Sequence, residues 1–127
     1  MSNQPDLPAW QLEQVRSALE LIAADPQAQF DHVERLGTAP SLDEVALEFE
    51  DVRGLIPGLV HRGLAPQQLE HMAKSIEDSF HEMEKSPDLW SRDALDRPQW
   101  QSLRTLGRQA LRLISSSEDS LHERSHT

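Results

Sequence analysis

The sequence predicts an all-α protein, a compact bundle of about four main helices and two short ones. Three observations support this fold class. Apolar residues recur every three or four positions in several segments, and Pro falls together with N-cap residues between those segments. No stretch alternates apolar and polar residues over the length of a strand, and Tyr, a residue typical of strands, is absent.

The first helix is expected to begin at residues 6–8 and to end near Ala24. Asp25 and Pro26 have the order of an N-cap followed by the first helical residue, so they predict a short second helix that stops at Gly37. The residues expected to face inward in these two helices are Leu12, Val15, Leu19, Ile22, Phe30, Val33 and Leu36.

Ser41 and Glu44 have the spacing of a capping box, which predicts a third helix that ends near Gly54. Pro66 is expected to start a fourth helix of about twenty residues. The residues expected to face inward in these two helices are Leu42, Val45, Ala46, Phe49, Val52, Leu69, Met72, Ala73, Ile76, Phe80 and Met83.

Ser86 and Pro87 open a short helical piece, and Asp96 with Gln99 repeats the capping-box spacing at the start of the last helix. That helix is expected to end near Ile114. The sequence therefore predicts one helical domain over residues 1–114, followed by a polar tail over residues 115–127 that we expect to be flexible.

Composition excludes several classes of function. The chain has 127 residues, a formal net charge of −10 and no Cys, so it has no disulfide framework and no thiolate site. An acidic surface repels phosphate backbones and anionic lipids, which argues against nucleic-acid and membrane partners. The first residues lack the basic and apolar plan of a signal peptide, so we expect a cytoplasmic protein.

Two groups of residues resemble metal sites, and we reject both. Residues 122–126 match the H-E-x-x-H pattern of zinc peptidases, but they lie in a short polar tail with no third ligand after them. His71, Asp78 and His81 share the side of the fourth helix that faces away from its apolar stripe, where a metal inside the bundle could not reach them. We therefore predict no metal, no cofactor and no catalytic residue, and a non-catalytic protein is favoured over an enzyme.

Charge is distributed unevenly along the chain. Residues 1–90 carry a formal charge of −11 and residues 91–127 carry +1. Glu44, Glu48 and Asp51 form an acidic stripe on the third helix. An edge of arginines follows the last helix, where it would either meet acidic neighbours within the chain or contact an anionic ligand: Arg97, Arg104, Arg108 and Arg112.

The segment from Gly54 to Gly63 combines three of the five glycines with four aliphatic residues. It is either a connector that closes one end of the bundle or an apolar loop that contacts a partner. Pro57 can start a single helical turn there, and Gly63 has the position of a glycine after a helix end.

These features together predict a protein that binds another protein with a basic surface, in the manner of an immunity protein, antitoxin, chaperone or adaptor. The expected contact residues are Glu44, Glu48, Asp51, Leu55, Ile56, Leu59 and Trp90. The alternative is an apolar small-molecule pocket, in a sensor or an enzyme, lined by residues 55–64 with Trp90 and Trp100. Leu47 and Trp10 lie off the apolar stripes of their helices, so both a monomer and a homodimer remain open.

Overall fold

The protein is an all-α bundle, as predicted from the sequence. A computed structural model describes residues 7–35 and 42–124, with side chains of the last helix described as far as Ser116. Four longer helices form the body, in chain order α1 (Leu7–Ala23), α3 (Asp43–Arg53), α5 (Gln68–Met83) and α6 (Pro98–Arg124). Two short helices, α2 (Pro26–Arg35) and α4 (Ile56–His61), and two 3₁₀ turns, η1 (Pro87–Trp90) and η2 (Arg92–Asp96), join them.

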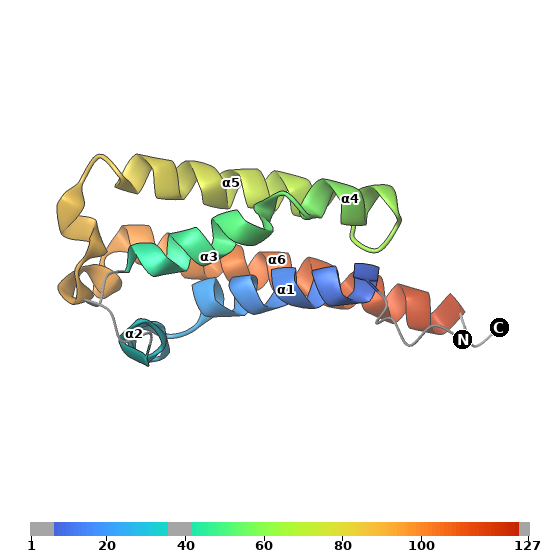
Figure 1. Ribbon diagram of the computed structural model, residues 1–127, viewed down its shortest axis with the longest axis horizontal. Helices are drawn as coiled ribbons and strands as arrows, with labels where there is room; N and C mark the ends of the chain where they lie inside the picture. Colours follow the sequence, from blue (N-terminus) through green and yellow to red (C-terminus); the bar gives the residue numbers. More distant parts are fainter. Residues whose placement is uncertain (1–6, 36–41, 125–127) are drawn as a thin grey trace.

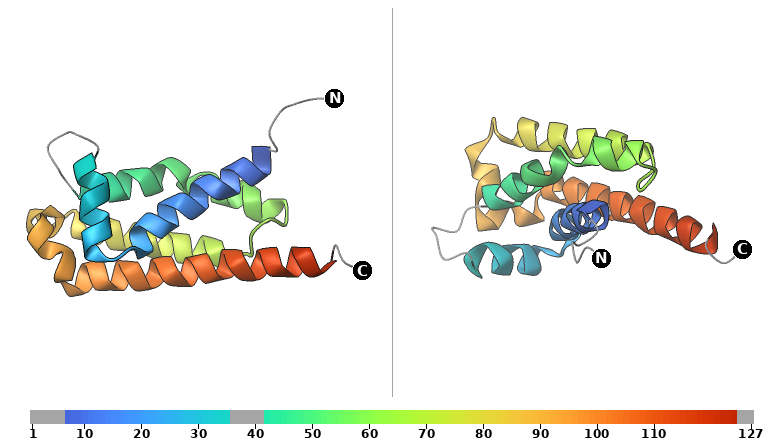
Figure 2. Two further views of the ribbon diagram at one scale, coloured as in Figure 1. Left: turned by 90° about the horizontal axis from the view of Figure 1, so that it is seen from below. Right: turned by 45° about the vertical axis from the view of Figure 1, so that its right-hand side comes forward.

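Helix α6 is the longest element, and the other helices are arranged around it (Figure 1). Helices α1 and α5 both pack against α6, and α3 packs against α1. Figure 2 shows α1 crossing obliquely between α6 on one side and α3 and α4 on the other, with α2 lying crosswise at one end. This arrangement leaves one side of α3 facing solvent.

The core consists of the apolar residues that the helical spacing places inward. Val15, Leu19 and Ile22 of α1 are buried, as are Val45 and Phe49 of α3. The stripe of α5 is buried from Leu69 to Met83, and that of α6 includes the fully buried Trp100, Leu103, Ala110 and Ile114. The periodicity of the sequence therefore identifies the core correctly in α1, α3 and α5.

Most of the expected helix boundaries are confirmed within two residues. The N-cap prediction for α2 is correct, because Asp25 Oδ1 accepts a hydrogen bond of 2.9 Å from the Ala28 backbone N–H. Gly63 ends α4 with φ of 75°, and the N–H groups of Gly63 and Leu64 donate to the carbonyls of Val60 and Leu59. This is a Schellman motif, which requires the left-handed conformation that Gly adopts without strain.

Two expectations about the last third of the chain are wrong. Asp96 is the final residue of η2, a turn the sequence did not predict, so it does not cap α6, which starts at Pro98. Helix α6 continues to Arg124, ten residues past the expected end at Ile114. No Gly or Pro interrupts residues 115–124, and adding residues to an existing helix costs far less than starting one.

Some predictions fall on residues outside the described ranges. These are the capping residue Ser41, the end of the second helix at Leu36 and Gly37, and the last residues of the tail, including His126.

Candidate functional site

The solvent-facing side of α3 carries one apolar residue among carboxylates. Val45, Phe49 and Val52 bury the inner side of this helix, so residues at intervening positions point outward. Leu47 is 47% exposed, which makes it one of three large apolar side chains on the described surface. Its exposed acidic neighbours on the helix are Asp43, Glu50 and Asp51. We call these four residues the α3 face.

The three carboxylates of the α3 face make no hydrogen bond or ion pair with any residue that the structure describes. Glu48 behaves differently, because its Oε2 lies 2.6 Å from Nε2 of His32 and so joins α3 to α2. Of the acidic stripe predicted from the sequence, Asp51 is exposed, Glu44 is half-buried and Glu48 is occupied by His32. The sequence prediction missed Asp43, Leu47 and Glu50 as members of this face, although the spacing of Leu47 and Glu50 relative to Val45 and Phe49 already places them outward.

The apolar segment after α3 belongs to the core. Ile56 and Leu59 are fully buried, so neither can contact a partner at the surface, contrary to the prediction. Leu55 is half-buried and packs against the core cluster. The reason is the α4 turn, which directs Ile56 and Leu59 inward at the end of the bundle. Of the two interpretations of this segment, the structure favours the connector.

Trp90 and Trp100 are held in an aromatic group with Phe49 and Phe80. Ring centroids are 5.9 Å apart for the two tryptophans and 6.2 Å apart for Phe80 and Trp90. The indole N–H of Trp100 donates to the Leu89 carbonyl at 2.7 Å, and that of Trp90 donates to the Met83 carbonyl at 3.1 Å. Both indoles are thus satisfied within the chain, and they fix the connection between α5 and α6.

A surface hollow of about 370 Å³ lies between the end of α5 and the start of α6. It has Met83 and Leu89 on its lining, and polar residues make up the rest: Ser79, Glu82, Lys85, Ser86, Gln99 and Ser102. The lining includes neither residues 55–64 nor the two tryptophans that the pocket alternative invoked. Glu82 and Lys85 pair with each other at 3.2 Å, so the charges at this hollow neutralise one another.

The four arginines of the predicted edge along the last helix differ in their exposure to solvent. Arg97, Arg108 and Arg112 are exposed, and none forms an ion pair with the described part of the chain. Arg104 is only 6% exposed, so it is not available to an anionic ligand at the surface, which was one of the two interpretations of this edge. Its Nη1 donates to Gln29 Oε1 at 3.1 Å, and its Nη2 donates to the Leu95 carbonyl at 2.8 Å. Burial, followed by the nearby Arg108, lowers the pKa of the Arg104 guanidinium.

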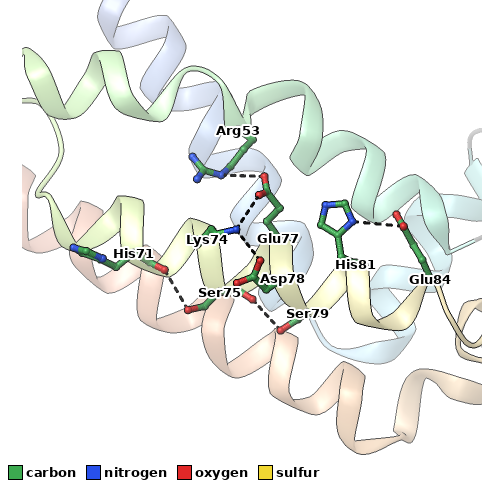
Figure 3. A network of polar contacts seen from close by, with 9 residues as sticks. All are labelled: Arg53, His71, Lys74, Ser75, Glu77, Asp78, Ser79, His81 and Glu84. Carbon is green, nitrogen blue, oxygen red and sulfur yellow. Dashed lines mark hydrogen bonds and ion pairs between the residues drawn. The ribbon is translucent and has the colours of Figure 1, made fainter.

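The outer side of α5 carries a connected set of ion pairs rather than a metal site (Figure 3). Arg53 reaches from α3 to Glu77 at 3.5 Å, and Lys74 lies 3.0 Å from Asp78. The hydrogen bond to Asp78 raises the pKa of Lys74. His71, Asp78 and His81 are exposed, as the sequence predicted, and the residues described here contain no group of three potential metal ligands. The H-E-x-x-H segment is not tested, because His126 lies outside them.

Among the described helices, none is both long enough and apolar enough to span a bilayer. No family model, curated protein or solved structure matches this chain.

Proposed function

We propose that this chain is a non-catalytic module that binds a protein with a basic surface through the α3 face. The observation that carries the proposal is the unpartnered state of Asp43, Glu50 and Asp51 around the exposed Leu47. Glu48 and Glu77 already have a histidine or cationic neighbour within the chain. Other exposed carboxylates, such as Glu20 and Glu34, also lack a described partner, so the α3 face is distinguished by the exposed Leu47 that lies among its three carboxylates. An exposed apolar side chain among unpaired carboxylates has the composition of a small protein–protein interface, with an apolar centre and a charged rim.

Charge complementarity explains what such a face would contribute. A partner with Lys and Arg opposite the α3 face would be steered to it, which increases the association rate and discriminates against acidic competitors. The net charge of −10 extends this attraction beyond the contact itself. At about 0.15 M salt the attraction is screened beyond roughly 8 Å, so binding should weaken as salt rises.

The experiment compares two variants with the same change in net charge. Glu50→Gln/Asp51→Asn neutralises the α3 face, whereas Glu20→Gln/Glu34→Gln neutralises two other exposed carboxylates. We expect a basic protein to co-purify stoichiometrically with the parent and with the second variant at low salt, and to be reduced about tenfold with the first. Quantitative mass spectrometry of the purified complexes measures this ratio. Equal loss from both variants, or from neither, would contradict the proposal.

A further inference from the structure

The hollow between the end of α5 and the start of α6 is built from residues 79–102, a single stretch of the chain. Helix α5 ends and α6 begins at the same end of the bundle, with η1 and η2 between them (Figure 1). The volume of about 370 Å³ is at the lower end of the roughly 300–1,000 Å³ that is typical of small-molecule pockets. We call it the α5–α6 hollow.

The floor of the α5–α6 hollow is apolar and is held in place by the core. Met83 is 2% exposed and Leu89 is 5% exposed, so these two residues form its inner side. The carbonyl of Met83 accepts the indole N–H of Trp90, and the carbonyl of Leu89 accepts that of the fully buried Trp100. The floor is therefore formed before a ligand arrives, which lowers the free-energy cost of binding.

Three uncharged polar side chains on the hollow have no partner among the residues that the structure describes. Ser86, Gln99 and Ser102 are exposed, and none of their side chains forms a hydrogen bond within that part of the chain. A hydroxyl group and a side-chain amide can each donate and accept hydrogen bonds. These three side chains can therefore bind both the donors and the acceptors of a polar ligand.

The two charged residues of the hollow carry opposite charges and stand side by side. Lys85 Nζ lies 3.2 Å from Glu82 Oε2, and the two side chains are 73% and 76% exposed. An ion pair this exposed contributes little to stability, so a ligand can replace it at low cost. A ligand with one charge would leave either Glu82 or Lys85 without its partner, whereas a ligand that carries an ammonium and a carboxylate group neutralises both.

From this lining we infer that the α5–α6 hollow binds a free amino acid with an aliphatic side chain. Its ammonium group contacts Glu82, its carboxylate contacts Lys85 and the neighbouring uncharged donors, and its side chain covers the apolar floor. Because the ligand is small and the charged residues are exposed, we expect a Kd on the order of 1 mM. The hollow shares no residue with the α3 face, so this inference goes beyond the proposed function and does not depend on it.

Titration of the ¹⁵N-labelled full chain with L-leucine tests the inference, because the indole N–H signals report on the floor directly. We expect the signals of Trp90 and Trp100 to shift with a Kd on the order of 1 mM. The signal of Trp10, which is not on the lining, should stay in place and serves as the internal control. No shift of Trp90 and Trp100 at about 20 mM leucine would overturn the inference.

Three derivatives of leucine test whether both charges are recognised. Leucinamide lacks the carboxylate charge, N-acetylleucine lacks the ammonium charge, and N-acetylleucinamide lacks both. Each should bind at least about tenfold more weakly than leucine. Leucinamide is the most stringent comparison, because the net charge of −10 attracts any cation. Binding of leucinamide or N-acetylleucinamide as tight as that of leucine would contradict the inference.

Variants locate the two charge contacts. Glu82→Gln and Lys85→Met should each raise the Kd of leucine about tenfold. Lys74→Met is the matched control, because it also removes an exposed lysine from an ion pair on α5, that with Asp78, but away from the hollow. It should change the Kd less than about twofold. Equal weakening by Lys74→Met and Lys85→Met, or an unchanged Kd in both hollow variants, would overturn the inference. All three side chains are exposed, so unchanged spectra of the free variants confirm that the fold is retained.

Discussion

Replacing Gln29 by Leu is expected to lower the free energy of unfolding by about 3 kcal/mol. Gln29 is fully buried, and its Nε2 donates to the carbonyls of Leu21 and Ile22 at 3.1 and 2.9 Å. Its Oε1 accepts from the buried guanidinium of Arg104. Leu fills a similar volume but makes none of these hydrogen bonds. The two carbonyls at the end of α1 therefore lose their donor, and the buried Arg104 guanidinium loses its acceptor.

Urea denaturation measures this loss, and Gln27→Leu is the matched control. Gln27 lies on the same helix and is exposed, and its Nε2 donates one hydrogen bond of 2.8 Å to Asp31 Oδ1 at the surface. We expect the control to change stability by less than about 1 kcal/mol. A loss below about 1 kcal/mol for Gln29→Leu would show that Gln29 and Arg104 do not act as a buried network.

The partner substitution Arg104→Met should cost less, about 1–2 kcal/mol, because it removes the buried charge along with its hydrogen bonds. Gln29 Oε1 and the Leu95 carbonyl lose a donor, but no cation remains unsatisfied. The double variant should therefore be more stable than the sum of the two single losses predicts, by about 1 kcal/mol or more.

Gly107→Val is the second substitution with a large expected effect, a loss of about 3 kcal/mol. A Cβ at Gly107 would lie 3.0 Å from the backbone nitrogen of Ala23 and 3.1 Å from Cγ2 of Ile22. The closest atom belongs to the main chain of α1, so relief requires α6 and α1 to move apart. A β-branched side chain also has little rotamer freedom in a helix with which to avoid the contact.

Substituting alanine for Gly58 and for Gly107 separates the steric contact with α1 from the gain in helix propensity. A Cβ at Gly58, inside α4, would meet nothing within 4 Å, so Gly58→Ala should stabilise the protein by about 0.5–1 kcal/mol. Gly107→Ala should instead destabilise it by about 1 kcal/mol, despite the same gain in helix propensity. Thermal unfolding of the three variants gives the comparison, and stabilisation by Gly107→Ala would refute the close packing of α1 on α6.

The fold could be predicted because the spacing of apolar residues within a helix shows which side of that helix is buried. The spacing of Val15, Leu19 and Ile22, or of Ile76, Phe80 and Met83, already identifies the inner side of each helix. Arg104 could not be assigned in this way, because its partner Gln29 is 75 residues away and no local pattern links them. The burial of Ile56 and Leu59 likewise depends on which elements meet at the end of the bundle.

The candidate site was predicted in part. The sequence indicated an acidic helix, and α3 has an exposed acidic side. It did not distinguish Glu48, which His32 occupies, from Asp51, which has no neighbour of opposite charge among the described residues. The pairing of Glu48 depends on a contact between α3 and α2, which the spacing along α3 does not encode. A pair within one helix, such as Lys74 with Asp78, can be expected from that spacing.

The central claim is that a basic partner contacts the α3 face, and site-specific photo-crosslinking in the native host cell tests it most directly. A benzophenone amino acid replaces Leu47 at the centre of the face, and Glu20, exposed on α1, serves as the control position. We predict one discrete cross-linked species from position 47, containing a different protein with a basic contact surface, and none from position 20. The same species from both positions, or no species from position 47, would contradict the account.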